Sequence, residues 1–189
     1  EISACLVGSE MCIRDRYLYP LIAIAAMLAI VFVMDLPHMH KPKQQLSQTI
    51  RIPAGQRAQM DLPDGSVVWL NSQTTLTYDE DFGKKDRKVT LDGEAYFEVA
   101  HNKEIPFYVQ TENIKVQVTG TKFDVCSYQG SNSFIARLIE GSINLLTNNA
   151  KEEKPITSLT KGKYFSMENG KYKTGEMSSN NALAWMQGI

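Results

Sequence analysis

The sequence predicts an all-β domain, either a β-solenoid-like roll or a β-sandwich, preceded by one transmembrane helix and followed by the start of another helix. Three observations support this prediction: an uncharged apolar stretch near the N-terminus, period-two alternation of apolar and polar residues beyond Thr49, and glycine-centred motifs at near-regular spacing. A chain of 189 residues has room for one domain with an appendage.

The composition excludes several classes of protein. The chain carries 20 Lys and Arg against 21 Asp and Glu, which argues against direct nucleic-acid binding through a broad basic surface. With 43% hydrophobic and 22% charged residues, wholesale disorder is excluded. The three cysteines form no CxxC pair, so neither a disulfide framework nor a zinc site is expected, and Cys126 is predicted to be a small hydrophobe in a strand.

Residues 1–16 are predicted to be a non-native leader. The heptapeptide EMCIRDR at residues 10–16 looks like the translation of a sequencing-library transposon end, so we exclude the leader from the fold. Residues 17–36 then predict a transmembrane helix, because YLYPLIAIAAMLAIVFVM holds 18 residues without a charge. As a helix these span about 27 Å.

Alternatives to this anchor are a cleaved signal peptide and a buried helix of a soluble core. No small-x-small peptidase site follows the apolar stretch, and buried helices usually keep a polar stripe, so an uncleaved anchor is favoured. Two arginines precede the stretch and two lysines follow it, at positions 14, 16, 41 and 43, so charge alone leaves the topology open.

Residues 37–48 are polar and predict a linker, in which His38 and His40 are expected to be solvated rather than to hold a metal. Residues 49–176 form the predicted β domain. Its alternating apolar positions are Ala58, Met60, Leu62, Ile114, Val116, Val118, Phe123, Val125, Ile143 and Leu145. At the C-terminus, Ser178 to Asn181 offer helix N-caps, and Ala182 to Met186 predict a helix.

A weak internal repeat runs through the β domain. The motifs LPDGSVVWL, LDGEAYFEV, VTGTKFDV, LIEGSINLL and LTKGKYFSM centre on Gly65, Gly93, Gly120, Gly141 and Gly162, at spacings of 28, 27, 21 and 21 residues. Stacked coils or successive hairpins produce such spacing. Of the two architectures, the roll is favoured over the closed sandwich.

No residues are predicted to be catalytic, to bind a cofactor or to bind a metal. Glu94 and Glu98 share a strand face with Tyr96, but four residues along a strand separate them by about 13 Å, so a solvated face is expected. Asp61 and Asp64 bracket a turn, where Asp satisfies backbone N–H groups, and His101 is expected on a surface turn. Five aromatic residues are expected in the core rather than on a stacking platform: Trp69, Tyr96, Phe97, Phe107 and Phe123.

Five motifs in order resemble the periplasmic domain of FecR-family anti-sigma regulators, particularly of the Bacteroidota type. The resemblance covers residues 49–167 and rests on PDGSVVWLN (Pro63–Asn71), LDGEAYFEVAHN (Leu91–Asn102), PFYV (Pro106–Val109), VTGTKFDV (Val118–Val125) and LIEGSINL (Leu138–Leu145). The terminal NALAWMQG resembles the start of the family's C-terminal domain, a small α/β module, so residues 177–189 are expected to be its truncated start.

The resemblance implies a single-pass inner-membrane protein with its β domain in the periplasm. It implies no enzyme activity and no cofactor. The implied partners are an extracytoplasmic-function sigma factor, bound through a cytoplasmic domain absent from this sequence, and the signalling domain of an outer-membrane TonB-dependent receptor, contacted mainly through the truncated C-terminal domain. Two other functions are kept open: a membrane-anchored periplasmic domain that binds or processes carbohydrate, and a self-stacking scaffold.

Overall fold

The computed structural model describes residues 23–32, 46–148, 153–177 and 184–187. The predicted leader, residues 17–22 and 33–36 of the apolar segment, and the linker up to residue 45 with its two histidines lie outside the described residues, as do residues 178–183. By its contacts the chain divides into two units, Glu1–Gln44 and Gln45–Ile189.

In the first unit, residues 23–32 form a helix whose side chains are all exposed. Ile24, Met27, Leu28 and Phe32 are each at least 57% exposed. Within the described part of the chain, no helix has both the length and the apolar character needed to cross a membrane.

The described residues of the second unit form thirteen strands and a short helix, α2 (Ala184–Gln187). The strands are β1 (Ser47–Arg51), β2 (Ala58–Asp61), β3 (Val67–Leu70), β4 (Thr75–Asp79), β5 (Arg87–Glu98), β6 (Phe107–Gln110), β7 (Ile114–Val118), β8 (Lys122–Ser127), β9 (Ser133–Glu140), β10 (Ser142–Thr147), β11 (Pro155–Thr160), β12 (Lys163–Glu168) and β13 (Lys171–Glu176).

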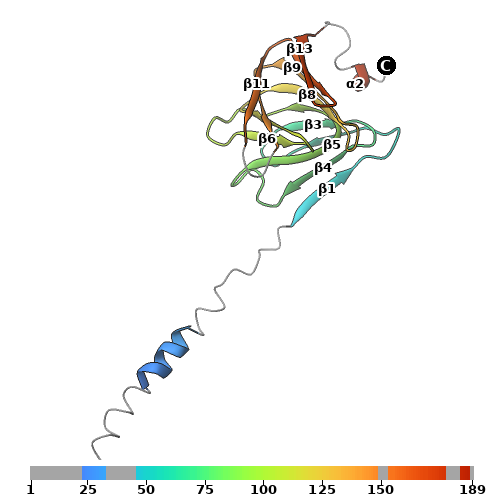
Figure 1. The fold of residues 1–189 in the computed structure, drawn as a ribbon. Helices are drawn as coiled ribbons and strands as arrows, with labels where there is room; N and C mark the ends of the chain where they lie inside the picture. Colours follow the sequence, from blue (N-terminus) through green and yellow to red (C-terminus); the bar gives the residue numbers. More distant parts are fainter. Residues whose placement is uncertain (1–22, 33–45, 149–152, 178–183, 188–189) are drawn as a thin grey trace, which may run out of the picture. The chain divides into compact units, whose positions relative to one another are not determined.

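These strands form two curled sheets that share the long strand β5 (Figure 1). The first half of β5 belongs to sheet A, in the order β1-β4-β5-β6-β7-β10-β11. Its second half belongs to sheet B, in the order β2-β3-β5-β8-β9-β12-β13. The all-β prediction is therefore confirmed, and the shared strand joins the two sheets into one curled body.

The directions in which the strands pair show that the favoured prediction, a solenoid-like roll, is wrong. Stacked solenoid coils pair in parallel, whereas every ladder between the described strands is antiparallel except that of β5 with β6. The glycines of the repeat mark changes of direction instead. Gly65 lies in the β2–β3 hairpin, and the other four lie where the chain passes between the sheets: Gly93, Gly120, Gly141 and Gly162.

The core lies between the inner faces of the two sheets. The predicted alternation is confirmed, since Ile114, Val116 and Val118 are at most 3% exposed while the residues between them are partly exposed. Phe97 of sheet B stacks on Phe123 at 5.1 Å between ring centroids and meets Phe107 of sheet A edge-on at 6.0 Å. Aromatic contacts of this kind hold the two sheets together.

Candidate functional site

Polar and aromatic side chains gather on the outer face of sheet B. The strand register places Trp69, Tyr96, Asp124, Arg137 and Tyr164 in one row across five neighbouring strands. Trp69 and Tyr96 are in contact, with ring centroids 5.3 Å apart. The expectation that Trp69 belongs to the core is wrong, because its side chain is only partly buried. Tyr96 is buried, at 4% exposed, but it lies on this outer face and outside the core cluster, which includes Phe97, Phe107 and Phe123.

A charged cluster, formed by Glu94, Asp124 and Arg137 and called here the Asp124 cluster, lies in and beside this row. Arg137 Nη1 pairs with Asp124 Oδ2 and lies 3.6 Å from Glu94 Oε1. Asn71 Nδ2 donates a hydrogen bond of 2.7 Å to Glu94 Oε2. The side chain of Asp124 is fully buried and that of Glu94 is 15% exposed.

Burial raises the pKa of the Asp124 carboxyl from its ordinary value of 3.8 to about 7, because the charged form is disfavoured away from water. This value is a net result, in which repulsion from Glu94 also raises the pKa while Arg137 and Trp185 lower it. One guanidinium thus serves two carboxylates. This arrangement favours uptake of a proton by Asp124.

Cys126 lies on the same outer face, two residues beyond Asp124, and is partly buried. Burial, followed by repulsion from Glu94 and Asp124, raises the pKa of its thiol to about 12. Because the thiolate is the reactive form, this cysteine is poorly suited to nucleophilic chemistry. The Asp124 cluster is therefore a structural or recognition feature of the sheet and offers no activated nucleophile.

The residues considered as acid pairs in the sequence take other roles. Glu94 and Glu98 do share a face with Tyr96, but they are not simply solvated, because the Tyr96 hydroxyl donates to Glu98 Oε1 at 3.0 Å and Glu94 belongs to the Asp124 cluster. Asp64 does cap its turn, accepting from Ser66 N at 3.0 Å, and His101 is exposed. Among the described residues, no group of His, Cys, Asp and Glu could hold a metal ion.

Sequence reasoning missed Arg87, whose side chain is 2% exposed. Its Nη1 lies 3.2 Å from Asp64 Oδ2, and its other hydrogen bonds run to the carbonyl oxygens of Ala100, Asn102 and Ile105. The Arg87 guanidinium thereby ties the β2–β3 hairpin to the loop between β5 and β6. The period-two pattern does not predict this role of Arg87. It identifies which positions of a strand point inward, but it does not indicate which of those side chains form hydrogen bonds or ion pairs.

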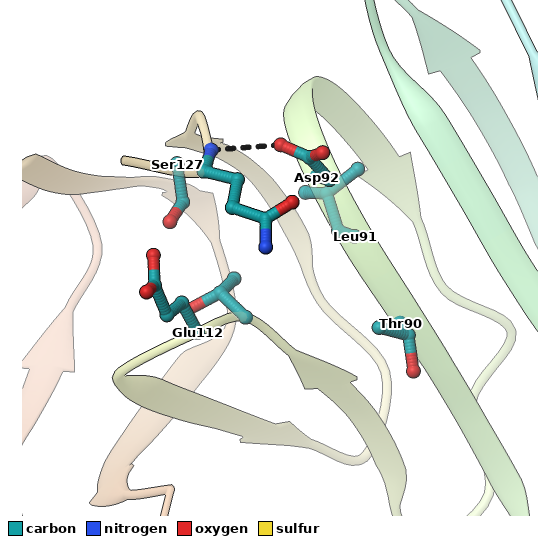
Figure 2. A pocket seen from close by; sticks show the side chains of 7 residues that line it. Thr90, Leu91, Asp92, Glu112 and Ser127 are labelled. Carbon is teal, nitrogen blue, oxygen red and sulfur yellow. Dashed lines mark hydrogen bonds between the residues drawn. The ribbon is translucent and has the colours of Figure 1, made fainter. Parts of the chain in front are cut away.

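A hollow of about 220 Å³ opens beside Gly93, where the sheets separate, and Figure 2 shows the carboxylates of Asp92 and Glu112 at its edge. Asp92 Oδ1 accepts a hydrogen bond of 2.8 Å from Gln129 N, and Glu112 Oε2 accepts one of 3.4 Å from Gly130 N. The hollow is smaller than the usual range for ligand sites, about 300–1,000 Å³. The carboxylates of Asp92 and Glu112 therefore hold the β8–β9 turn against sheet A through these two hydrogen bonds.

A larger groove of about 540 Å³ lies between the ends of β7, β10 and β11 and the β12–β13 hairpin. Tyr172, which is 58% exposed, lies along it with three asparagines, Asn113, Asn132 and Asn169. No carboxylate is among the described residues that line this groove. The described lining of this groove therefore supplies no acid pair of the kind that glycoside hydrolysis requires.

The comparisons with known proteins agree with this architecture. Two crystal structures of a protein from Parabacteroides distasonis, described as a "putative anti-sigma factor", superpose with TM-scores of 0.67 and 0.66 at 28% sequence identity. The superposed regions cover 76% and 75% of this chain. They cover 66% and 65% of the two crystal-structure chains, so this chain spans just under two thirds of the length of its relative. A search of curated proteins found no match.

A protein-family comparison covers the centre of the β body. The family model described as FecR protein matches residues 48–144. That range holds 97 residues (144 − 48 + 1), just over half of the 189 in the chain, and it includes β5 and the Asp124 cluster. This chain belongs to the FecR family.

Proposed function

We propose that the chain is the membrane anchor and relay body of a regulator of an extracytoplasmic-function sigma factor. The observation that carries the proposal is the FecR match over residues 48–144, together with the shared fold of an anti-sigma factor at 28% identity. In this proposal residues 17–36 cross the inner membrane, the β body stands in the periplasm, and an outer-membrane TonB-dependent receptor delivers the signal.

The chemistry of the body supports a relay rather than a transformation of a substrate. The acids near Gly93 are hydrogen-bonded to backbone N–H groups, Cys126 holds its proton, and the Asp124 cluster has no neighbouring nucleophile in its ionised form. A relay needs only a folded body whose contacts differ between two states. The absence of enzyme activity stays a prediction.

The carbohydrate-binding alternative has less support. It requires a groove with several exposed aromatics and, for hydrolysis, two close carboxylates. Along the described lining of the 540 Å³ groove, Tyr172 is the one aromatic residue and there is no acid.

The proposal is tested by recovering the natural protein, with an affinity tag at its C-terminus, from cross-linked membranes of its own host. Mass spectrometry of the purified material is expected to identify an extracytoplasmic-function sigma factor, enriched at least tenfold over an untagged strain. Recovery of the tagged protein from membranes without enrichment of any sigma factor would contradict the proposal. Soluble glycans added to the purified protein are expected to leave its melting temperature unchanged, and a reproducible rise would favour the carbohydrate-binding alternative.

A further inference from the structure

The helix α2 lies against the outer face of sheet B. Trp185 and Met186 line a small hollow of about 140 Å³ together with residues of β2 and β3, among them Gln59, Trp69 and Leu70. The described part of α2 is only one turn long, so its position depends on this contact and not on helix stability.

Two buried side-chain atoms of the described residues lack a hydrogen-bond partner, and they belong to facing groups: Asp124 Oδ1 and Trp185 Nε1. The indole lies near enough to Asp124 to lower the pKa of its carboxyl. A buried polar atom without a partner costs about 1–3 kcal/mol. An indole N–H can only donate and a carboxylate oxygen accepts, so a small rotation of either side chain would satisfy both atoms.

The length of chain before α2 permits this contact. Strand β13 ends at Glu176 at the edge of sheet B, and the row across the sheet leads from β13 through β12 and β9 to Asp124 on β8. Three strand spacings amount to about 14 Å. The seven residues 177–183 reach at most about 25 Å when extended. The following segment can therefore return over the sheet that it has just completed.

We propose that the outer face of sheet B is the seat of the segment that follows β13, with Trp185 as its anchor and Asp124 as the hydrogen-bond acceptor of the indole. The row of Trp69, Tyr96, Asp124 and Arg137 supplies a surface that is aromatic at one end and charged at the other, which matches an indole with its apolar ring and single N–H. The seat couples the position of the C-terminal segment to the β body. This inference does not depend on the identity of any sigma factor or receptor.

Fluorescence quenching of Trp185 tests the seat directly. The chain has two tryptophans, so Trp69→Phe leaves Trp185 as the single emitter while keeping an aromatic ring beside Tyr96. In the full chain purified in detergent, the acrylamide quenching constant is expected to be at least threefold below that of the same chain in guanidinium chloride. Equal quenching in the two conditions would overturn the proposal.

Substitution of the acceptor separates a seated tryptophan from one that is merely shielded. Adding Asp124→Ala to the Trp69→Phe chain is expected to raise the quenching constant at least twofold, whereas Asp61→Ala, at an exposed position on β2, leaves it unchanged. Should Asp124→Ala unfold the body, Asp124→Asn serves in its place, because its side-chain oxygen still accepts the indole N–H and Trp185 stays protected. Exposure of Trp185 in the folded Asn variant, or no change in a folded Ala variant, would contradict the seat.

Sedimentation of the same samples identifies the occupant. We expect Trp185 to be protected from acrylamide in a monomer, which would mean that the C-terminal segment lies on sheet B of its own chain. Protection that appears only in a dimer would overturn the proposal in favour of exchange between two copies.

Discussion

Arg87 is the buried cation around which two connections of the fold are arranged. Its guanidinium meets the Asp64 carboxylate and three backbone carbonyl oxygens, and its Cζ lies 5.8 Å from the Phe107 ring centroid. With its charge and donors matched in this way, the arginine can remain inside the body. The sequence shows it only as one more inward position at the start of β5.

Replacing Arg87 with Met leaves Asp64 buried without its cation and three carbonyls without a donor. We expect the free energy of unfolding to fall by about 3–5 kcal/mol, as when one partner of a buried ion pair is removed. Urea unfolding followed by circular dichroism measures the loss.

Lys85→Met is the matched control, because the Lys85 side chain is 72% exposed in its pair with Asp81. It is expected to change the free energy of unfolding by less than about 1 kcal/mol. A similar small change for Arg87→Met would show that the buried pair does not organise these connections.

Asp124 makes the stability of the body depend on pH. Its pKa of about 7 in the folded chain exceeds the ordinary value of 3.8, so the folded chain holds the proton more tightly than the unfolded chain. The resulting stabilisation is complete below about pH 4 and is lost as the pH rises through 7. Relative to Asp124→Asn, the parent chain is expected to lose stability over this window at up to about 1.4 kcal/mol per pH unit.

The groups that face Asp124 are Glu94 and Tyr96 on β5, Cys126 on β8, Arg137 on β9 and Trp185 on α2. Urea unfolding of both chains between pH 4 and 8 measures the difference. A constant difference across this range would mean that Asp124 titrates at its ordinary pKa.

At the scale of elements, strand β5 decides the architecture because it belongs to both sheets. Gly93 lies where the strand passes from sheet A to sheet B and has a φ of 131°. A Cβ at this position would lie 2.7 Å from Thr74 Cα, closer than real Cβ contacts. A side chain there would push β5 away from the connection that leads into β4.

Gly93→Ala is therefore expected to cost at least 2 kcal/mol more than Gly130→Ala. Gly130 also has a positive φ, 77°, but nothing lies within 4 Å of its added Cβ, so only the backbone cost of about 1–2 kcal/mol remains. Thermal and urea unfolding of both variants check the difference. Equal losses would show that the close approach to Thr74 does not constrain the shared strand.

The elements were largely predictable from the sequence, whereas their pairing was not. Alternation identifies strands such as β7 because one face of the strand is buried and the other is partly exposed. It carries no information on the partner of a strand, so the regular glycines were compatible with stacked coils as well as with hairpins. The Asp124 cluster could not be predicted for the same reason, because Asp124 and Arg137 are brought together only by the register of β8 with β9.

At the scale of the whole molecule, the proposed anchor predicts where the chain resides in the cell. Ile24→Arg combined with Leu28→Arg is expected to move the protein from the carbonate-resistant membrane fraction to the soluble fraction. Each arginine near a helix centre costs about 2.5–3.5 kcal/mol for insertion.

Leu46→Arg is the control, because Leu46 is 69% exposed just before β1 and lies outside the proposed span. Its product is expected to stay with the membrane. A doubly substituted chain that remains resistant to carbonate extraction would argue against the span.

The central claim is that this FecR-type body relays a signal to a sigma factor, and the transcriptome of the host tests it most directly. A chromosomal in-frame deletion of residues 49–176 is compared with the intact gene and with Asp61→Asn. The account predicts at least a fivefold change in one set of genes that share a promoter class of an extracytoplasmic-function sigma factor, with no change in the Asp61→Asn strain. The account would be contradicted if the shortened protein is still found in the membrane and the transcript levels of every such gene set match those of the intact strain.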